Sequence, residues 1–157
     1  AINTLLFYVQ SFIAPKIATV FEQHTPKHWM AVLKVYARVQ KCLRHSILEC
    51  PMTDMGGLFF ALAMKESRSS LIYIDWNDNR VIYAYIFAVR DWEGGKFCIP
   101  QLGIKIPVQL GQVLAVLACV VAHFSAPMTT GHRIVFICFT DILLFQHTHP
   151  KFFIVVT

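Results

Sequence analysis

Hydrophobic residues recur every three or four positions between Thr25 and about His45. This period places them along one side of an amphipathic helix. Thr25 is a candidate N-cap, and Pro26 suits the first helical turn because its missing N–H is not needed there. The predicted apolar stripe consists of Trp29, Leu33, Tyr36, Val39 and Leu43.

A second face of the same predicted helix is basic. It carries Lys27, Lys34, Arg38, Lys41 and His45. Such a stripe is either a solvated surface or a track for a phosphate backbone. The residues we select as nucleic-acid candidates are Lys34, Arg38 and Lys41.

From residue 58 onward the pattern changes to short β-branched and aromatic runs. The residues between them, as in "WNDN", "DWEGG" and "APMTTG", are those that tight turns require. Short runs at this spacing predict a sandwich or a barrel. The predicted strands are 58–64, 71–75, 81–88, 96–99, 103–108, 112–117, 119–125 and 132–140.

Helices followed by strands predict an α+β protein, with helices supporting a sheet. A chain of 157 residues with 56% hydrophobic content suits one compact domain. We expect helical support over 1–50, a β core over 56–142, and a tail, 143–157, that could add an edge strand.

The composition adds weaker constraints. The 14 Lys and Arg residues against 9 Asp and Glu give a formal net charge of +5, which suits a polyanionic partner without selecting one. The best membrane candidate, 106–122, has only about ten continuous apolar residues, whereas a span needs about 20, and we predict no membrane association.

The five cysteines lack CxxC spacing, and the N-terminus lacks the basic leader of a secretory signal. Both features favour an intracellular protein with reduced thiols. The nucleus is one candidate compartment.

Three residues of the β region could form a site: Asp75, His123 and Arg133. Non-haem Fe(II) oxygenases bind their metal with two imidazoles and one carboxylate. An arginine can then hold the distal carboxylate of a keto acid through two parallel hydrogen bonds. Taken singly, the same residues also suit a turn acceptor, a buried histidine and a salt bridge on a sheet.

Three blocks carry a resemblance to a known family: "YIDWNDN", "DWEGGKFCIPQLGIKIPVQLGQVLAVLACVVAHFSAP" and "TTGHRIVFICFTD". They resemble a fungal family of 2-oxoglutarate/Fe(II) dioxygenase domains, which is similar to the Tet/JBP nucleic-acid-modifying oxygenases. The resemblance covers about 56–142. It implies a double-stranded β-helix (jelly-roll, cupin-like) core, Fe(II) and 2-oxoglutarate as cofactors, and 5-methylcytosine in DNA as the best-known related substrate.

The resemblance places Asp75 and His123 at two metal-ligand, and hence catalytic, positions and Arg133 at the 2-oxoglutarate clamp. Tyr73 occupies the position of the first histidine ligand. A phenol with an ordinary pKa of about 10 is a poor substitute for imidazole toward Fe(II). Tyr73 is therefore either a core aromatic residue or a phenolate ligand to oxidised iron.

Other positions depart from the family pattern, which has glycine at Arg90, an acidic residue at Lys96 and Arg-Pro at Gln109 and Leu110. If the turn at Arg90 needs positive φ, a residue other than glycine strains it. We therefore predict a diverged copy with weak or absent dioxygenase activity. The alternative is a non-catalytic module that binds nucleic acid or a small carboxylate.

Overall fold

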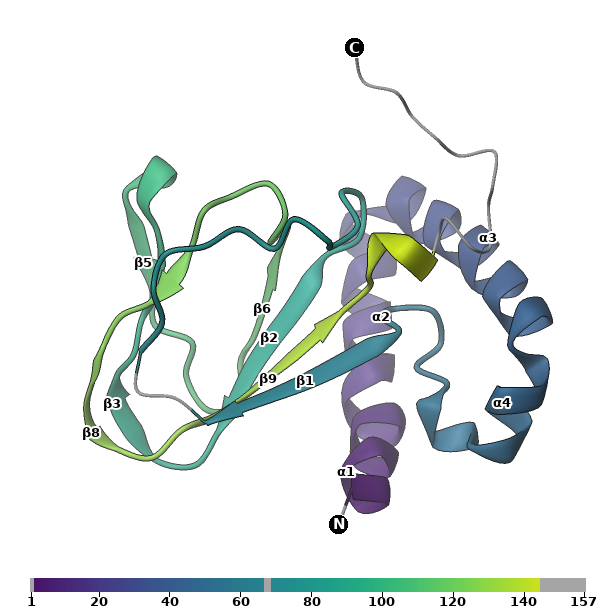
Figure 1. Cartoon of the computed structure of the whole chain (residues 1–157), viewed down its shortest axis with the longest axis horizontal. Coiled ribbons are helices and arrows are strands. Elements are labelled where there is room, and N and C mark those ends of the chain that lie inside the picture. The colour runs from purple at the N-terminus through teal and green to yellow at the C-terminus, as the bar shows by residue number, and fades with distance from the viewer. Residues whose placement is uncertain (1, 67–68, 145–157) are drawn as a thin grey trace. The chain divides into compact units, whose positions relative to one another are not determined.

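The computed structural model of the chain describes residues 2–66 and 69–144 (Figure 1). They form two compact units. One contains the residues up to Phe60 and those from Asp141 onward, and the other is Ala61–Thr140. The first unit is helical and the second is built from antiparallel strands, so the predicted α+β class is confirmed.

The described residues of the helical unit include α-helices α1 to α4 and two short helical segments of other types. Its core includes the buried side chains of Val9, Ile17, Phe21, Val32 and Val39. The elements are α1 (Ile2–Tyr8), the π-helical η1 (Val9–Ile13), α2 (Ala14–His24), α3 (Pro26–Cys42), α4 (Arg44–Glu49) and the 3₁₀ segment η2 (Pro51–Thr53).

Helix α3 corresponds to the helix predicted from the apolar stripe. Thr25 lies at its N-cap position, but the Thr25 hydroxyl donates to the Phe21 carbonyl, 3.0 Å away, and makes no capping bond to α3. Leu43, the last residue of the predicted apolar stripe, lies outside α3, which ends at Cys42, and its side chain is 41% exposed.

The helical run Ile2–His24 is long and apolar enough to cross a membrane by length and composition alone. A single helix of this kind is weak evidence, since the core helix of a soluble protein passes the same test. The segment 106–122, which the sequence offered as the best candidate, instead contains a strand and turns.

The β unit is built on a four-stranded antiparallel sheet in the order β1-β9-β2-β6. Strand β2 is buried along most of its length and pairs on both sides, for example Tyr85 with Cys138 of β9 and with Ala115 of β6. The four strands are β1 (Ala61–Glu66), β2 (Ala84–Val89), β6 (Val113–Val116) and β9 (Ile134–Phe139).

Two smaller antiparallel sheets complete this unit, one of β3 and β8 and the other in the order β5-β4-β7. Side chains from β2, β4, β6 and β9 share one hydrophobic cluster, among them Ile86, Phe97 and Val116. The remaining strands are β3 (Trp92–Gly94), β4 (Phe97–Ile99), β5 (Ile104–Ile106), β7 (Phe124–Ser125) and β8 (Met128–Gly131), with the 3₁₀ turn η3 (Pro100–Leu102) after β4.

Three predictions about the β unit are wrong. Of the predicted strand 119–125, only Phe124–Ser125 is a strand. The segments "DWEGG" and "APMTTG" were assigned to turns, yet they supply β3 and β8, which pair across an irregularity between Glu93 and Gly94. The predicted strand 71–75 is only a single bridge, between Tyr73 and His123. The predicted edge strand in the tail 143–157 falls almost wholly outside the described residues.

Candidate metal and carboxylate site

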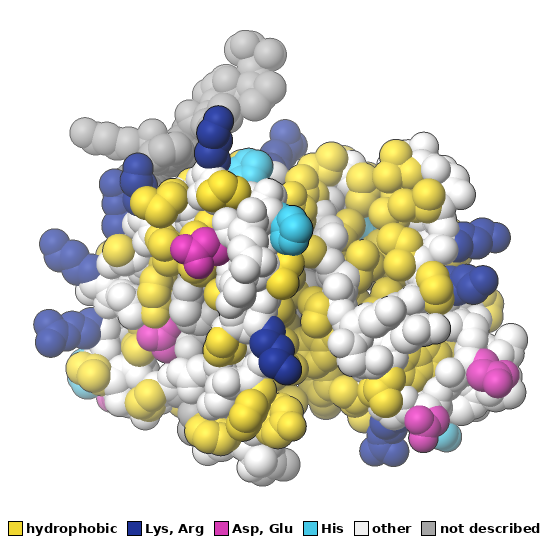
Figure 2. All heavy atoms as spheres, turned by 180° about the vertical axis from the view of Figure 1, so that it is seen from behind, with side chains coloured by type: hydrophobic (Ala, Val, Ile, Leu, Met, Phe, Trp, Pro, Cys, Tyr) yellow, Lys and Arg dark blue, Asp and Glu magenta, His cyan; other side chains and the backbone are white. Residues whose placement is uncertain are grey.

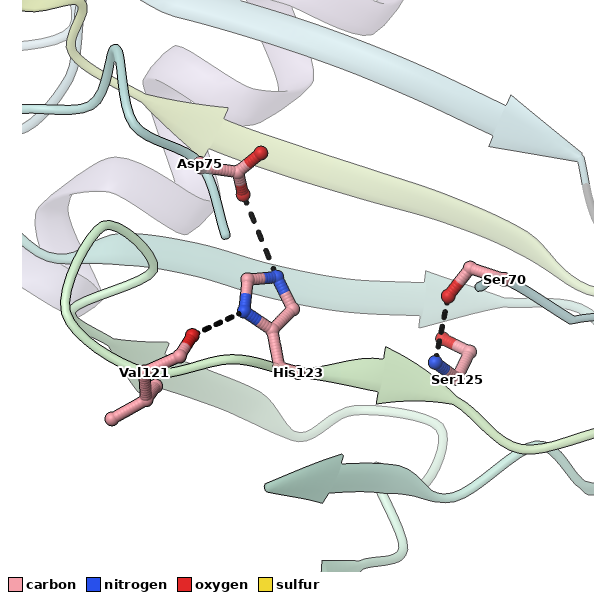
Figure 3. A network of polar contacts seen from close by, with 5 residues as sticks. All are labelled: Ser70, Asp75, Val121, His123 and Ser125. Carbon is pink, nitrogen blue, oxygen red and sulfur yellow. Dashed lines mark hydrogen bonds and ion pairs between the residues drawn. The ribbon is translucent and has the colours of Figure 1, made fainter. Parts of the chain in front are cut away.

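The bridge between Tyr73 and His123 brings two distant segments together. The Tyr73 N–H donates to the His123 carbonyl at 3.0 Å, and the His123 N–H donates to the Tyr73 carbonyl at 2.9 Å. Ser70 and Ser125 extend the contact, because the Ser125 N–H donates to the Ser70 hydroxyl at 2.8 Å (Figure 3). At the other end, the Asp75 N–H donates to the Ala118 carbonyl at 3.1 Å.

The Asp75 carboxylate points toward the His123 imidazole in this arrangement (Figure 3). Asp75 Oδ2 lies 3.5 Å from His123 Nε2, and the His123 side chain is 1% exposed. His123 Nδ1 lies 2.9 Å from the Val121 carbonyl oxygen. Since a carbonyl can only accept, Nδ1 carries a proton and donates it, which leaves Nε2 facing Asp75.

Opposing effects act on the pKa of His123. Burial lowers this pKa, whereas the hydrogen bonds with Asp75 and Val121 and the charges of Asp75 and Asp78 raise it. Together these effects outweigh burial, so the pKa is raised overall. Burial also raises the pKa of the Tyr73 phenol, and the charges of Asp75 and Asp78 raise it further. Without a bound cation, the site therefore favours a protonated phenol.

Aromatic rings enclose the imidazole of His123. The Tyr73 ring centroid lies 4.5 Å from the imidazole centroid at an interplanar angle of 59°. Phe97 stacks on the imidazole, with 5.1 Å between centroids and an angle of 24°. Tyr73 is 38% exposed, so this side of the site reaches solvent.

Arg133 is buried, with 4% of its surface exposed. Its Nη1 donates to the Gly95 carbonyl, while Nε and Nη2 have no hydrogen-bond partner among the described residues. Burial lowers the pKa of Arg133. A buried charge with unpaired donors is costly, and native proteins usually compensate it with a partner. This guanidinium therefore has the free donors that a bound anion would need.

Arg133 and His123 contact the same short piece of chain. Arg133 touches Gly95 and His123 stacks on Phe97. Two residues of chain span at most about 7 Å, so the two side chains lie in one region of the β unit. Gly95 also allows the approach, because a Cβ atom there would lie 2.5 Å from Arg133 Nη1.

Conventional metal ligands are too few here for a complete site. Within residues 2–66 and 69–144, no group of three or more His, Cys, Asp and Glu side chains could hold a metal ion. Asp75 and His123 form the pair that the sequence analysis selected, and Tyr73 lies beside them.

Arg90 has φ 81°, and no other described residue except glycine has positive φ. The strain predicted for this position is therefore present. Together with Lys96, Gln109 and Leu110, Arg90 lines a cleft of about 650 Å³ in the β unit. The positions at which the chain departs from the family pattern, Tyr73 excepted, thus share one cleft, a feature that the sequence analysis missed.

The nucleic-acid candidates Lys34, Arg38 and Lys41 are exposed on α3, in the helical unit. Their spacing of three and four residues places them along one side of that helix. In Figure 2 the Lys and Arg side chains do not merge into one patch on the face in view.

No protein-family model and no curated protein sequence matches the chain. Among solved structures, the chain is similar to NgTET1 in complex with 5mC DNA, with a TM-score of 0.54 and 17% sequence identity. The match covers 85% of this chain and 50% of that one, so the chain spans about half of the length of its structural relative. At this identity the likeness shows a shared fold.

Two structures of the viral collagen prolyl hydroxylase vCPH from Paramecium Bursaria Chlorella virus-1 were also found. One is a 2OG complex, with a TM-score of 0.38 and 16% identity over 64% of this chain and 69% of that one. The other, a truncated form, gives a TM-score of 0.37 and 15% identity over 64% of this chain and 65% of that one. These two superpose too weakly to add to the argument. The comparisons therefore show a fold in common with NgTET1, and the fungal origin of the resemblance stays a prediction.

Proposed function

We propose that the chain is a 2-oxoglutarate/Fe(II) dioxygenase-like protein with a double-stranded β-helix core, whose turnover is weak or absent. The fold shared with NgTET1 supports the class. The observation that carries the proposal is the buried guanidinium of Arg133, whose Nε and Nη2 have no partner among the described residues.

Arg133 fits the distal carboxylate of 2-oxoglutarate. A carboxylate can accept two parallel hydrogen bonds from one guanidinium, and such charge-assisted pairs are stronger than neutral hydrogen bonds. A bound carboxylate would also compensate the buried positive charge. The 2-oxoglutarate part of the proposal therefore agrees with the residues present.

The residues fit Fe(II) less well. Asp75 and His123 supply a carboxylate and an imidazole, but the third ligand position holds Tyr73, whose pKa is raised by burial and by nearby carboxylates. A neutral phenol donates little to a divalent ion that prefers imidazole. We therefore assign no reaction step to iron in this chain and expect weak ferrous binding.

For the substrate we propose a methylated base in DNA, because NgTET1 was solved with 5mC DNA. A base in duplex DNA must be flipped out of the stack before an enzyme can modify it. The exposed residues Lys34, Arg38 and Lys41 are the proposed phosphate contacts, and such contacts weaken steeply with salt.

Replacing Tyr73 with histidine tests the proposal. We expect Tyr73→His to raise Fe(II) affinity about tenfold or more, since one ligand is added, and to raise 2-oxoglutarate turnover. Tyr73→Phe is the matched control, because it keeps an aromatic ring and adds no ligand. Calorimetry under anaerobic conditions and a succinate assay give the readouts. A folded Tyr73→His variant with neither gain would contradict the proposal.

A second function, a non-catalytic module for small carboxylates or nucleic acid, is favoured by the combination of free donors on Arg133 and an incomplete ligand set. This module would bind 2-oxoglutarate without a metal and would gain no turnover from Tyr73→His. Salt-dependent DNA binding that weakens when Lys34, Arg38 and Lys41 are neutralised would add nucleic acid to its ligands.

A further inference from the structure

The cleft that Arg90 lines in the β unit is separate from the candidate metal and carboxylate site. Its volume is about 650 Å³, which lies within the range of roughly 300–1,000 Å³ that small-molecule sites occupy. Residues of β3 and β8 and the chain 107–110 line it, and none of Asp75, His123 and Arg133 does. A ligand in this cleft would therefore contact different side chains from those proposed for 2-oxoglutarate.

Apolar side chains line one part of this cleft. Trp92 and Val108 are half-buried, because both also pack against the hydrophobic cluster of the β unit. The core therefore holds Trp92 in place while part of its surface stays open to the cleft. A partly exposed indole offers a flat surface on which an aromatic ring of a ligand can stack.

Two cations of the cleft are available for an anionic ligand. Arg90 and Lys96 are exposed, and neither forms an ion pair with another described residue. The chain next to each is tied to a neighbouring segment. The His132 N–H donates to the carbonyl of Asp91 at 2.9 Å, and the Ala126 N–H donates to the carbonyl of Lys96 at 2.9 Å. A fixed backbone lowers the entropy that the two side chains lose when they bind a ligand.

The backbone of Arg90 is strained at this cleft. Its φ of 81° lies in the left-handed region, which is unfavourable for a residue with a Cβ atom. The Arg90 side chain is exposed, so packing in the core does not explain why a large residue stands where glycine would be free of strain. Strained residues of this kind cluster at functional sites. The role of Arg90 then lies in what its guanidinium binds.

The carboxylates of Asp91 and Glu93 limit the charge that the ligand can carry. Both residues line the cleft, and they balance the formal charges of Arg90 and Lys96. A polyphosphate would meet repulsion from these carboxylates, whereas a single phosphate can lie at the cations alone. The carboxylates can also accept hydrogen bonds from the exocyclic amino group of cytosine or adenine.

We propose that this cleft binds a nucleoside monophosphate, either free or as one nucleotide of a single strand. The base stacks on Trp92, and the phosphate lies at Arg90 and Lys96. Binding is reversible, and no covalent bond forms or breaks. The inference goes beyond the proposed function, because the cleft needs neither a metal nor 2-oxoglutarate and none of its residues belongs to α3.

Calorimetric titration of the metal-free full chain with deoxycytidine monophosphate tests the inference. The wild type should bind it saturably, and deoxycytidine, which lacks the phosphate, about tenfold more weakly. Arg90→Gly should weaken binding of the monophosphate about tenfold, although it relieves backbone strain. Lys96→Gln should weaken it about fivefold, as expected for a more exposed ion pair. Lys105→Gln is the matched control and should bind like the wild type, because Lys105 is an exposed lysine of β5 that does not line the cleft.

A single strand of deoxycytidine nucleotides separates the two sources of the ligand. Tighter binding of the strand than of the monophosphate, weakened by Arg90→Gly, supports the cleft as a site for a strand, whereas equal or weaker binding of the strand supports a site for the free nucleotide. No saturable binding to the folded wild type would overturn the inference. Affinity unchanged in both Arg90→Gly and Lys96→Gln, or lowered as much in Lys105→Gln, would also overturn it.

Circular dichroism establishes that each variant is folded, and titration with 2-oxoglutarate on the same samples separates this result from the proposed function. Nucleotide binding that depends on Arg90 in a chain that does not bind 2-oxoglutarate removes the proposed function and keeps the nucleotide site. Binding of 2-oxoglutarate that depends on Arg133, in a chain that binds no nucleotide, removes the nucleotide site alone.

Discussion

The two ends of the candidate site differ in how their charges are paired. At one end, Asp75 and His123 face each other, and Val121 accepts the second ring N–H. At the other end, Arg133 is equally buried but has one bonded nitrogen, to Gly95, and two without partners among the described residues. The charges at the first end compensate each other, whereas two donors at the second end have no partner among the described residues.

Under the proposed function, this difference separates the position of Tyr73, which departs from the family resemblance, from the position of Arg133, which agrees with it. Tyr73 replaces a histidine that the family resemblance expects, and the site there can fold without metal because its remaining members bond to each other. Arg133 has no partner of this kind for Nε and Nη2 among the described residues. A residue that destabilises the ligand-free protein is explained more readily by a role in function than by a role in folding.

Gly95→Ala should have the largest effect on stability and should affect the Arg133 end selectively. Gly95 has φ 61°, and a Cβ atom would lie 2.5 Å from Arg133 Nη1. Strain and displacement of the guanidinium should cost about 2 kcal/mol and weaken 2-oxoglutarate binding about tenfold.

The matched control is Gly103→Ala, since Gly103 has φ 65° and no atom within 4 Å of the added Cβ. It should lose about 1 kcal/mol and keep full 2-oxoglutarate affinity. Urea denaturation and calorimetry measure the two quantities. Equal losses of affinity in both variants would show that Arg133 is not involved.

Arg133→Met should stabilise the ligand-free protein by about 1 kcal/mol, because it removes a buried charge with unpaired donors while keeping much of the volume. The measurement is the free energy of unfolding in urea without 2-oxoglutarate. A loss of stability instead would identify Arg133 as a structural residue and would remove the contrast between the two ends.

Arg90→Gly should stabilise the protein by about 0.5 kcal/mol. Relief of the left-handed conformation gains about 1 kcal/mol, and the greater freedom of glycine in the unfolded chain offsets part of it. Arg90→Ala is the control, since alanine at φ 81° keeps the strain. A similar gain in both variants would mean that the charge of Arg90, rather than its backbone, is responsible.

The smallest expected effect is a dependence of stability on pH at the Asp75 end. The pKa of His123 is raised above its ordinary value of 6.5. The contribution of His123 to the free energy of unfolding is therefore fully present below pH 6.5. It is lost as the pH rises through the higher pKa that His123 has in the folded protein. Asp75→Asn should flatten this dependence in thermal unfolding between about pH 5 and 8. An unchanged pH profile in this variant would show that the pair of Asp75 and His123 is not the source of the pH dependence.

The sequence predicts elements well where the signal is local. The period of α3 and the β-branched run of β9 both indicate the correct element, because burial of one face follows directly from the residue pattern. The pairing of β3 with β8 was missed because glycine and threonine there favour turns locally, and their partner lies more than thirty residues away.

The candidate site was predictable only in part. Asp75, His123 and Arg133 were selected from residue type, order and resemblance, and the structure brings Asp75 and His123 together. The contact of Arg133 with Gly95 and its unpaired donors could not be foreseen, since they depend on how separate strands approach. For Leu71 and Ile72, the apolar pattern predicted a strand, yet both are exposed and unpaired with a sheet.

The most direct test of the account is a calorimetric titration of 2-oxoglutarate into the metal-free chain, with Arg133→Met as the comparison. Two charge-assisted hydrogen bonds contribute about 3 kcal/mol to the free energy of binding, so the variant should bind 2-oxoglutarate about 100-fold more weakly. The account predicts saturable binding to the wild type that this substitution removes. Equal affinity in the two proteins, or no binding to a folded wild type, would contradict it.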